Sequence, residues 1–102
     1  GIGLSLVPGM IFSNEPGFYK TGQYGIRTEN LILVTAGQAG SSFQGFETIT
    51  LCPIDRTLID ASFLDKQERQ WLNSYHKKVK ESLSPLLGSQ EKEWLQRETQ
   101  PL

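Results

Sequence analysis

Short apolar runs separated by turn residues fill the first half of the chain, a pattern typical of β-strands. We expect strands over residues 10–14, 24–34 and 46–52, because each run is rich in apolar or β-branched residues and is bounded by Gly, Pro or polar residues. Residues 35–44 are small and polar, which predicts a surface loop. The first half therefore indicates β-structure.

The second half follows a helical spacing instead. From Leu64 onward, apolar positions recur about every 3.6 residues, at Leu64, Trp71, Leu72, Tyr75, Val79 and Leu83. The spacing of Asp65 and Glu68 resembles a capping box, with Asp in place of Ser or Thr, at the start of this helix. We expect Pro85 to kink or end it, Gly88 to cap it, and Ser89 to cap a second, shorter helix.

These elements predict an α+β chain in which antiparallel strands precede two C-terminal helices. We place the strands in residues 1–55 and the helical extension in residues 56–102. The helical stripe has two interpretations: a core face packed on the sheet, or a surface that meets a partner.

Composition and charge narrow the class of protein. The 102 residues suit about one small domain, and a net charge of −1 gives no reason to expect a nucleic acid or an anionic membrane as partner. The longest apolar run is shorter than the roughly 18 residues of a membrane helix. The single Cys52 cannot form an internal disulfide, which favours the cytoplasm, and we expect it to be a small buried residue. Because Gly1 is not an initiator Met, we expect a truncated piece of a longer polypeptide.

Two glutamates in the strand region suggest chemistry. Glu15 and Glu29 are equally distant from Gly22, so a hairpin folded about that glycine would bring their carboxylates side by side. A shared cation would remove their repulsion, and carboxylates bind Mn, Mg, Ca and Zn. Arg27 shares the face of Glu29, where it would keep that carboxylate ionised and oriented. On the residues alone, a solvated Glu/Arg surface pair remains the alternative.

The motifs around these glutamates resemble those of a known superfamily. Residues 13–19 (SNEPGFY) and 24–30 (YGIRTEN) resemble the last two metal-ligand motifs of the pita-bread metallopeptidases. The tail, with LCPID at 51–55, WLNSYH at 71–76 and WLQRETQPL at 94–102, resembles the C-terminal extension of the large, cytosolic-type Xaa-Pro aminopeptidases. The resemblance covers essentially the whole chain.

The resemblance implies a C-terminal part of the pita-bread fold and specific roles. Glu15 would be a metal ligand and proton shuttle, Glu29 would bridge two metal ions, and Arg27 and Tyr19 would orient ligands and substrate. The family's ions are Mn, or else Zn or Co. They activate a bridging water that attacks the carbonyl before a proline at the second position of a peptide.

The family's other ligands, two Asp and one His, would lie upstream of this chain. We therefore expect an incomplete site and an inactive fragment that depends on the missing N-terminal part. The lone His76 is expected at the helix surface or an interface. The resemblance also implies a homodimer. The alternatives are a catalytically inactive pita-bread interaction module and a prolidase-type dipeptidase, against which the tail after Pro53 speaks.

Overall fold

A computed structural model describes residues 5–37 and 43–102 of the chain. The chain divides into two compact units, one up to Thr50 and the other from Leu51 onward, which are described separately. The α+β class and the order of strands before two helices are confirmed. No helix in the described part is long and apolar enough to cross a membrane.

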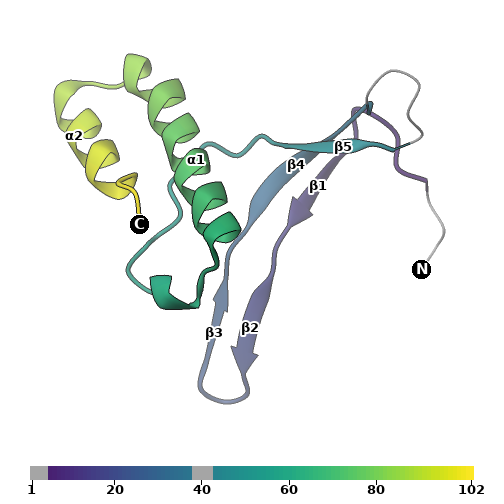
Figure 1. The fold of residues 1–102 in the computed structure, drawn as a ribbon, viewed down its shortest axis with the longest axis horizontal. Helices are drawn as coiled ribbons and strands as arrows, with labels where there is room; N and C mark the ends of the chain where they lie inside the picture. The colour runs from purple at the N-terminus through teal and green to yellow at the C-terminus, as the bar shows by residue number, and fades with distance from the viewer. Residues whose placement is uncertain (1–4, 38–42) are drawn as a thin grey trace. The chain divides into compact units, whose positions relative to one another are not determined.

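The first unit is a long antiparallel hairpin with one additional strand (Figure 1). Its strands are β1 (Ile11–Asn14), β2 (Gly17–Lys20), β3 (Tyr24–Arg27), β4 (Asn30–Thr35) and β5 (Gly45–Thr48). The strands β1, β4 and β5 form one sheet in the order β1-β4-β5, and β2 pairs with β3. Most side chains of this unit are exposed, and Val34 is its fully buried apolar residue.

The hairpin turns at Gly22, as the sequence predicts. Gly22 has a φ of +72°, a left-handed conformation that favours glycine, and Gln23 N–H donates to the Lys20 carbonyl at 3.0 Å. Asn14 pairs with Asn30 in one ladder, and Gly17 pairs with Arg27 in the other. The members of every pair are equally distant from Gly22, so one register runs through both ladders.

Two predicted strands were wrong in extent. The strand expected over residues 24–34 is interrupted at Thr28 and Glu29, where the partner strand carries Pro16. The strand expected over residues 46–52 ends at Thr48. After the 2.9 Å bond from Ile49 N–H to the Leu31 carbonyl, the Leu31 N–H donates to the Thr50 hydroxyl at 2.7 Å rather than to a backbone carbonyl. Residues 38–42 of the expected surface loop lie outside the described part.

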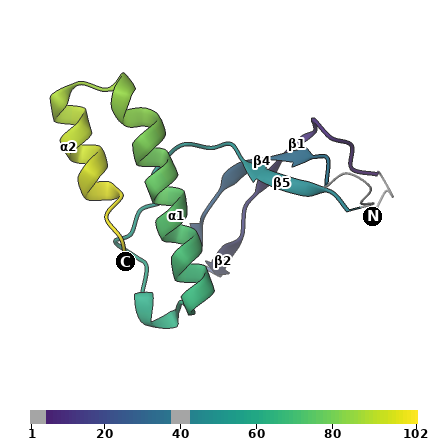
Figure 2. The ribbon, with the colours of Figure 1, turned by 45° about the horizontal axis from the view of Figure 1, so that its top comes forward.

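The second unit is a helical hairpin. Its elements are η1 (Ala61–Phe63), α1 (Lys66–Leu83), η2 (Ser84–Leu86) and α2 (Ser89–Glu98). Figures 1 and 2 show α2 running antiparallel beside α1. Asp65 and Glu68 form the predicted capping box, with bonds of 2.7 and 3.0 Å.

Pro85 ends α1 as predicted, because α1 stops at Leu83 and Pro85 falls in the short η2 turn. The prediction for Gly88 and Ser89 was wrong. Gly88 is the N-cap of α2: its carbonyl accepts the Lys92 N–H at 3.0 Å, and no side-chain cap is made. Leu87 already closes the preceding turn by donating to the Ser84 carbonyl, so Gly88 belongs to the next helix.

Tyr75, Val79 and Leu95 form the core of the helical unit, with Ile54, Leu83 and Leu87 packed against them. Of the predicted stripe, Trp71 instead lies 52% exposed, stacked on Tyr75 with ring centroids 5.5 Å apart. Trp94 is 48% exposed. Cys52 is exposed, so its predicted burial was wrong.

His76 is fully buried, which contradicts its expected place at the helix surface. Its Nε2 accepts the Ile54 N–H at 3.0 Å, while the neighbouring Tyr75 hydroxyl donates to the Cys52 carbonyl at 2.7 Å. These two side chains attach the extended segment before η1 to α1. His76 is therefore a structural residue whose Nε2 acceptor requires the neutral ring.

Burial lowers the pKa of His76 below its ordinary value of 6.5, and the positive charge of Arg56 lowers it further. The negative charge of Glu98 opposes this lowering. The Ile54 N–H donates to Nε2 and therefore favours the neutral ring. Arg56 is itself held at the end of α2, where it donates to the Arg97 and Gln100 carbonyls at 2.5 and 2.9 Å. In the neutral ring the proton lies on Nδ1, which is buried without a hydrogen-bond partner.

This arrangement predicts a loss of stability in mild acid. Below pH 6.5 the unfolded state binds a proton at His76 that the folded state does not, so the free energy of unfolding falls as pH falls toward the folded pKa. The slope is at most about 1.4 kcal/mol per pH unit. Urea unfolding at pH 7.5, 6.5 and 5.5 measures it. His76→Gln keeps an acceptor for the Ile54 N–H and should reduce the slope of the free energy of unfolding against pH. An equal slope in the variant would show that His76 does not cause the pH dependence.

Candidate functional site

The continuous register places Glu15 directly opposite Glu29. The pair lies between the two ladders, after Asn14–Asn30 and before Gly17–Arg27, with no extra residue in either strand. A slip of one residue would have placed the two side chains on opposite faces. The register therefore places both glutamate residues on one face of the hairpin.

The hydrogen-bond pattern of the hairpin indicates that Glu15 and Glu29 form one of its closely spaced, non-hydrogen-bonded pairs. Val34 N–H donates to the Met10 carbonyl at 2.8 Å, and Thr28 N–H donates to the Pro16 carbonyl at 3.1 Å. Because bonded and non-bonded pairs alternate along an antiparallel ladder, the Glu15–Glu29 pair is a non-bonded one, in which Cα atoms are typically about 4.5 Å apart and side chains lie close. Pro16 has no N–H and cannot return the bond to Thr28, which explains the gap in the strands beside the glutamates.

Three successive pairs share the face of the two glutamates. Alternation along the strands puts Gly17 and Arg27 next to them, followed by Tyr19 and Gly25. All four residues predicted for the site, Glu15, Tyr19, Arg27 and Glu29, are thus on one side of the hairpin.

Arg27 contacts Glu29 along its own strand. Its Nε lies 3.9 Å from the Glu29 Oε2, with the two side chains 53% and 44% exposed. An exposed pair at this distance contributes at most about 1 kcal/mol to stability. The contact therefore contributes little to the stability of the fold.

The ring of Tyr19 lies over two glycines of the same face. A Cβ at Gly17 would meet the Tyr19 hydroxyl oxygen at 2.7 Å, and a Cβ at Gly25 would meet the ring Cδ1 at 2.7 Å. The ring thus extends from Gly25 back to Gly17, with its hydroxyl on the side of the carboxylate pair. The role of these glycines was not predicted from the sequence, although they occupy the same strand face as Tyr19.

The two glutamates supply only part of a metal site. Within residues 5–37 and 43–102, no three His, Cys, Asp or Glu side chains gather in an arrangement that could hold an ion. The aspartates after the strands serve local structure: Asp55 accepts the Thr57 N–H at 2.9 Å, and this bond lowers the pKa of Asp55 below its ordinary value. Asp60 caps η1, and Asp65 caps α1.

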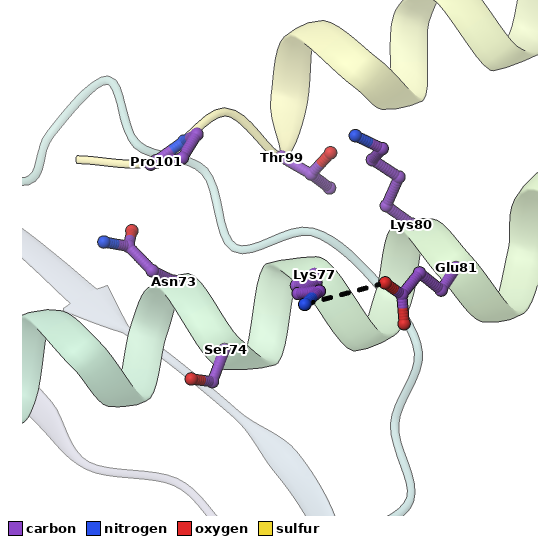
Figure 3. A pocket seen from close by; sticks show the side chains of 7 residues that line it. All are labelled: Asn73, Ser74, Lys77, Lys80, Glu81, Thr99 and Pro101. Carbon is purple, nitrogen blue, oxygen red and sulfur yellow. Dashed lines mark ion pairs between the residues drawn. The ribbon is translucent and has the colours of Figure 1, made fainter.

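A pocket of about 430 Å³ in the helical unit offers no comparable chemistry (Figure 3). It is lined by Asn73, Ser74, Lys77, Lys80, Glu81, Thr99 and Pro101. Lys77 faces Glu81 at 3.9 Å on the exposed surface of α1. The Asn73 Oδ1 accepts the Leu102 N–H at 2.9 Å, so this residue fastens the C-terminal segment to α1.

Comparisons with known proteins identify the family of this chain. The family model "Metallopeptidase family M24" matches residues 3–36, which include both glutamates. The model "C-terminal region of peptidase_M24" matches residues 42–102, more than half of the chain.

The curated relatives that resemble this chain are aminopeptidases P. A "Probable Xaa-Pro aminopeptidase P" of Coprinopsis cinerea is 47% identical over 96% of this chain, and "Aminopeptidase P2" of Arabidopsis thaliana is 46% identical over 92%. The chain covers 17% and 14% of the lengths of these two proteins. It thus corresponds to a small part of each relative.

A solved structure extends the likeness to the fold. It is described as the "Crystal structure of X-prolyl aminopeptidase from Caenorhabditis elegans: a cytosolic enzyme with a di-nuclear active site". The match has a TM-score of 0.79 and 33% identity, and covers 95% of this chain and 17% of that one. From the family models and these relatives together, the chain belongs to metallopeptidase family M24 and is homologous to Xaa-Pro aminopeptidase P over nearly its whole length.

Proposed function

We propose that this chain supplies two carboxylates to the dinuclear metal site of an aminopeptidase that hydrolyses the bond between an N-terminal residue and a following proline. The observation that carries the proposal is the direct opposition of Glu15 and Glu29 on one hairpin face of a family M24 chain. Two carboxylates in a close pair repel each other unless cations lie between them.

The donor set fits divalent ions that prefer oxygen ligands. Glu29 is the carboxylate proposed to bridge both ions, and Glu15 is proposed to bind one of them and to move a proton during hydrolysis. Arg27, 3.9 Å from the Glu29 Oε2, turns that carboxylate toward the shared face. The Tyr19 hydroxyl, on the same face, can donate a hydrogen bond to substrate.

Bound ions, Mn in the first instance and otherwise Zn or Co, supply Lewis acidity and lower the pKa of a water molecule that serves as nucleophile. The substrates proposed are peptides with proline at the second position. The cytosolic description of the Caenorhabditis elegans enzyme supports a cytoplasmic location for this protein too.

The chain alone is proposed to be inactive. Two carboxylates offer at most about four oxygen ligands, whereas two divalent ions need about four to six ligands each. The remaining ligands, proposed to be two Asp and one His, would come from the rest of the polypeptide. The exposed Trp71 and Trp94 of the helical unit support self-association, and we propose a homodimer, which sedimentation equilibrium tests.

The experiment that tests the function compares three substrates. The full-length protein that carries this sequence is loaded with Mn and given an Xaa-Pro-Xaa tripeptide, an Xaa-Ala-Xaa tripeptide and an Xaa-Pro dipeptide. Release of the first residue from the Pro tripeptide, with little from the Ala tripeptide, supports the aminopeptidase. Cleavage of the dipeptide alone indicates a prolidase-type enzyme. No cleavage with Mn, Zn or Co indicates an inactive interaction module.

A further inference from the structure

The backbone conformation at Gly17 and Gly25, the two glycines beneath Tyr19, does not require glycine. Among the described residues, Gly9 and Gly22 are the glycines with positive φ, so Gly17 and Gly25 adopt conformations open to other residues. Both lie inside strands, where glycine weakens pairing and packs no side chain. Their use at these positions therefore needs another explanation.

Space for the Tyr19 ring supplies that explanation. A Cβ at Gly25 would lie 2.7 and 3.2 Å from the ring atoms Cδ1 and Cε1, and a Cβ at Gly17 would lie 2.9 Å from both Cε2 and Cζ. Such distances are shorter than carbon atoms tolerate, and the ring would have to leave. The ring can move, because Tyr19 is 64% exposed. The two glycines thus form a floor on which the ring lies flat.

The floor determines where the hydroxyl lies. Tyr19 lies four positions after Glu15, which corresponds to about 13 Å along an extended hairpin. The ring folds back over Gly25 and Gly17, so the hydroxyl oxygen lies beside Gly17, about halfway to the carboxylate pair. A tyrosine standing upright from the strand would point its hydroxyl away from that pair.

We propose that Gly17 and Gly25 are positioning residues that hold the Tyr19 ring flat, with its hydroxyl directed toward the Glu15–Glu29 pair, where it contacts substrate. This inference rests on the proposed function for its chemistry and on the hairpin geometry for its mechanism. An alanine at either position lifts the ring and withdraws the hydroxyl, although the alanine itself touches no substrate.

A double-mutant cycle in the full-length protein tests the proposal. Gly25→Ala is expected to lower kcat/KM on an Xaa-Pro-Xaa peptide by about 10- to 100-fold, the range seen when a group that orients an active-site residue is lost. In a Tyr19→Ala background the same change should alter kcat/KM less than about twofold, because no ring remains to displace. Gly88→Ala, which meets only the carboxylate end of Glu91, is the matched control.

Crystal structures of the unmodified protein and of Gly25→Ala give a readout independent of activity. The ring is expected over Gly17 and Gly25 in the first and lifted from them in the second. Three results would contradict the proposal that the glycines hold the Tyr19 ring. These are an unchanged kcat/KM in Gly25→Ala, an equal loss with and without the Tyr19 ring, or a ring that stays in place in the Gly25→Ala crystal structure. Failure of the unmodified protein to hydrolyse any peptide would overturn the proposed function and the substrate contact, while the crystal structures would still decide whether the glycines hold the ring.

Discussion

Replacing Glu29 with Gln in the full-length protein is expected to reduce the hydrolysis of Xaa-Pro peptides by about 1000-fold or more. The change keeps the shape of the side chain but removes the charge that would hold two cations together. A metal-activated water accounts for several kcal/mol of the barrier, and each tenfold loss of rate corresponds to about 1.4 kcal/mol. Initial rates of release of the first residue measure the effect.

The matched control for this experiment is Glu81→Gln. Glu81 is another exposed glutamate, paired with Lys77 at 3.9 Å on α1 and placed here outside the catalytic machinery. We expect the control to retain full activity, since exposed ion pairs contribute at most about 1 kcal/mol. Comparable rates for the Glu29→Gln variant and the unmodified protein would exclude Glu29 as a ligand.

The largest effect on stability is expected at Leu95. This residue is 1% exposed and packs with Tyr75 and Val79 where α2 meets α1. Leu95→Ala removes buried methyl groups and leaves a cavity, so it should lower the free energy of unfolding by about 3 kcal/mol. Chemical denaturation monitored by circular dichroism measures the change.

Leu86→Ala supplies the comparison for this prediction. Leu86 is 79% exposed in the short turn between the helices, so its truncation should change the free energy of unfolding by less than about 0.5 kcal/mol. Equal destabilisation by the two changes would show that Leu95 is not part of the core described above.

The sequence predicted the hairpin because its information is local. Gly22 at the midpoint between Glu15 and Glu29 predicted the turn, and the positive φ of that glycine confirms it. The interruption at Thr28 was missed because its cause, the absent N–H of Pro16, lies on the opposite strand. The sequence of one strand does not show which residues of the partner strand lie opposite it.

The helical unit shows the same limit. The capping box of Asp65 and Glu68 is a short-range signal and was predicted correctly. His76 was placed at the surface because it was read by residue type, although Leu72, His76 and Val79 follow the helical spacing and are all buried. Only the position of Ile54, whose N–H bonds to the ring, explains why an imidazole is tolerated there.

The carboxylate pair is the centre of this account, and metal content tests it most directly. Plasma mass spectrometry on the full-length protein, loaded with Mn and dialysed, should find two ions per chain, and fewer in both the Glu15→Gln and Glu29→Gln variants. The Glu81→Gln control should keep both ions. Two ions per chain in either glutamate variant at the site would contradict the claim that this hairpin face holds the metals.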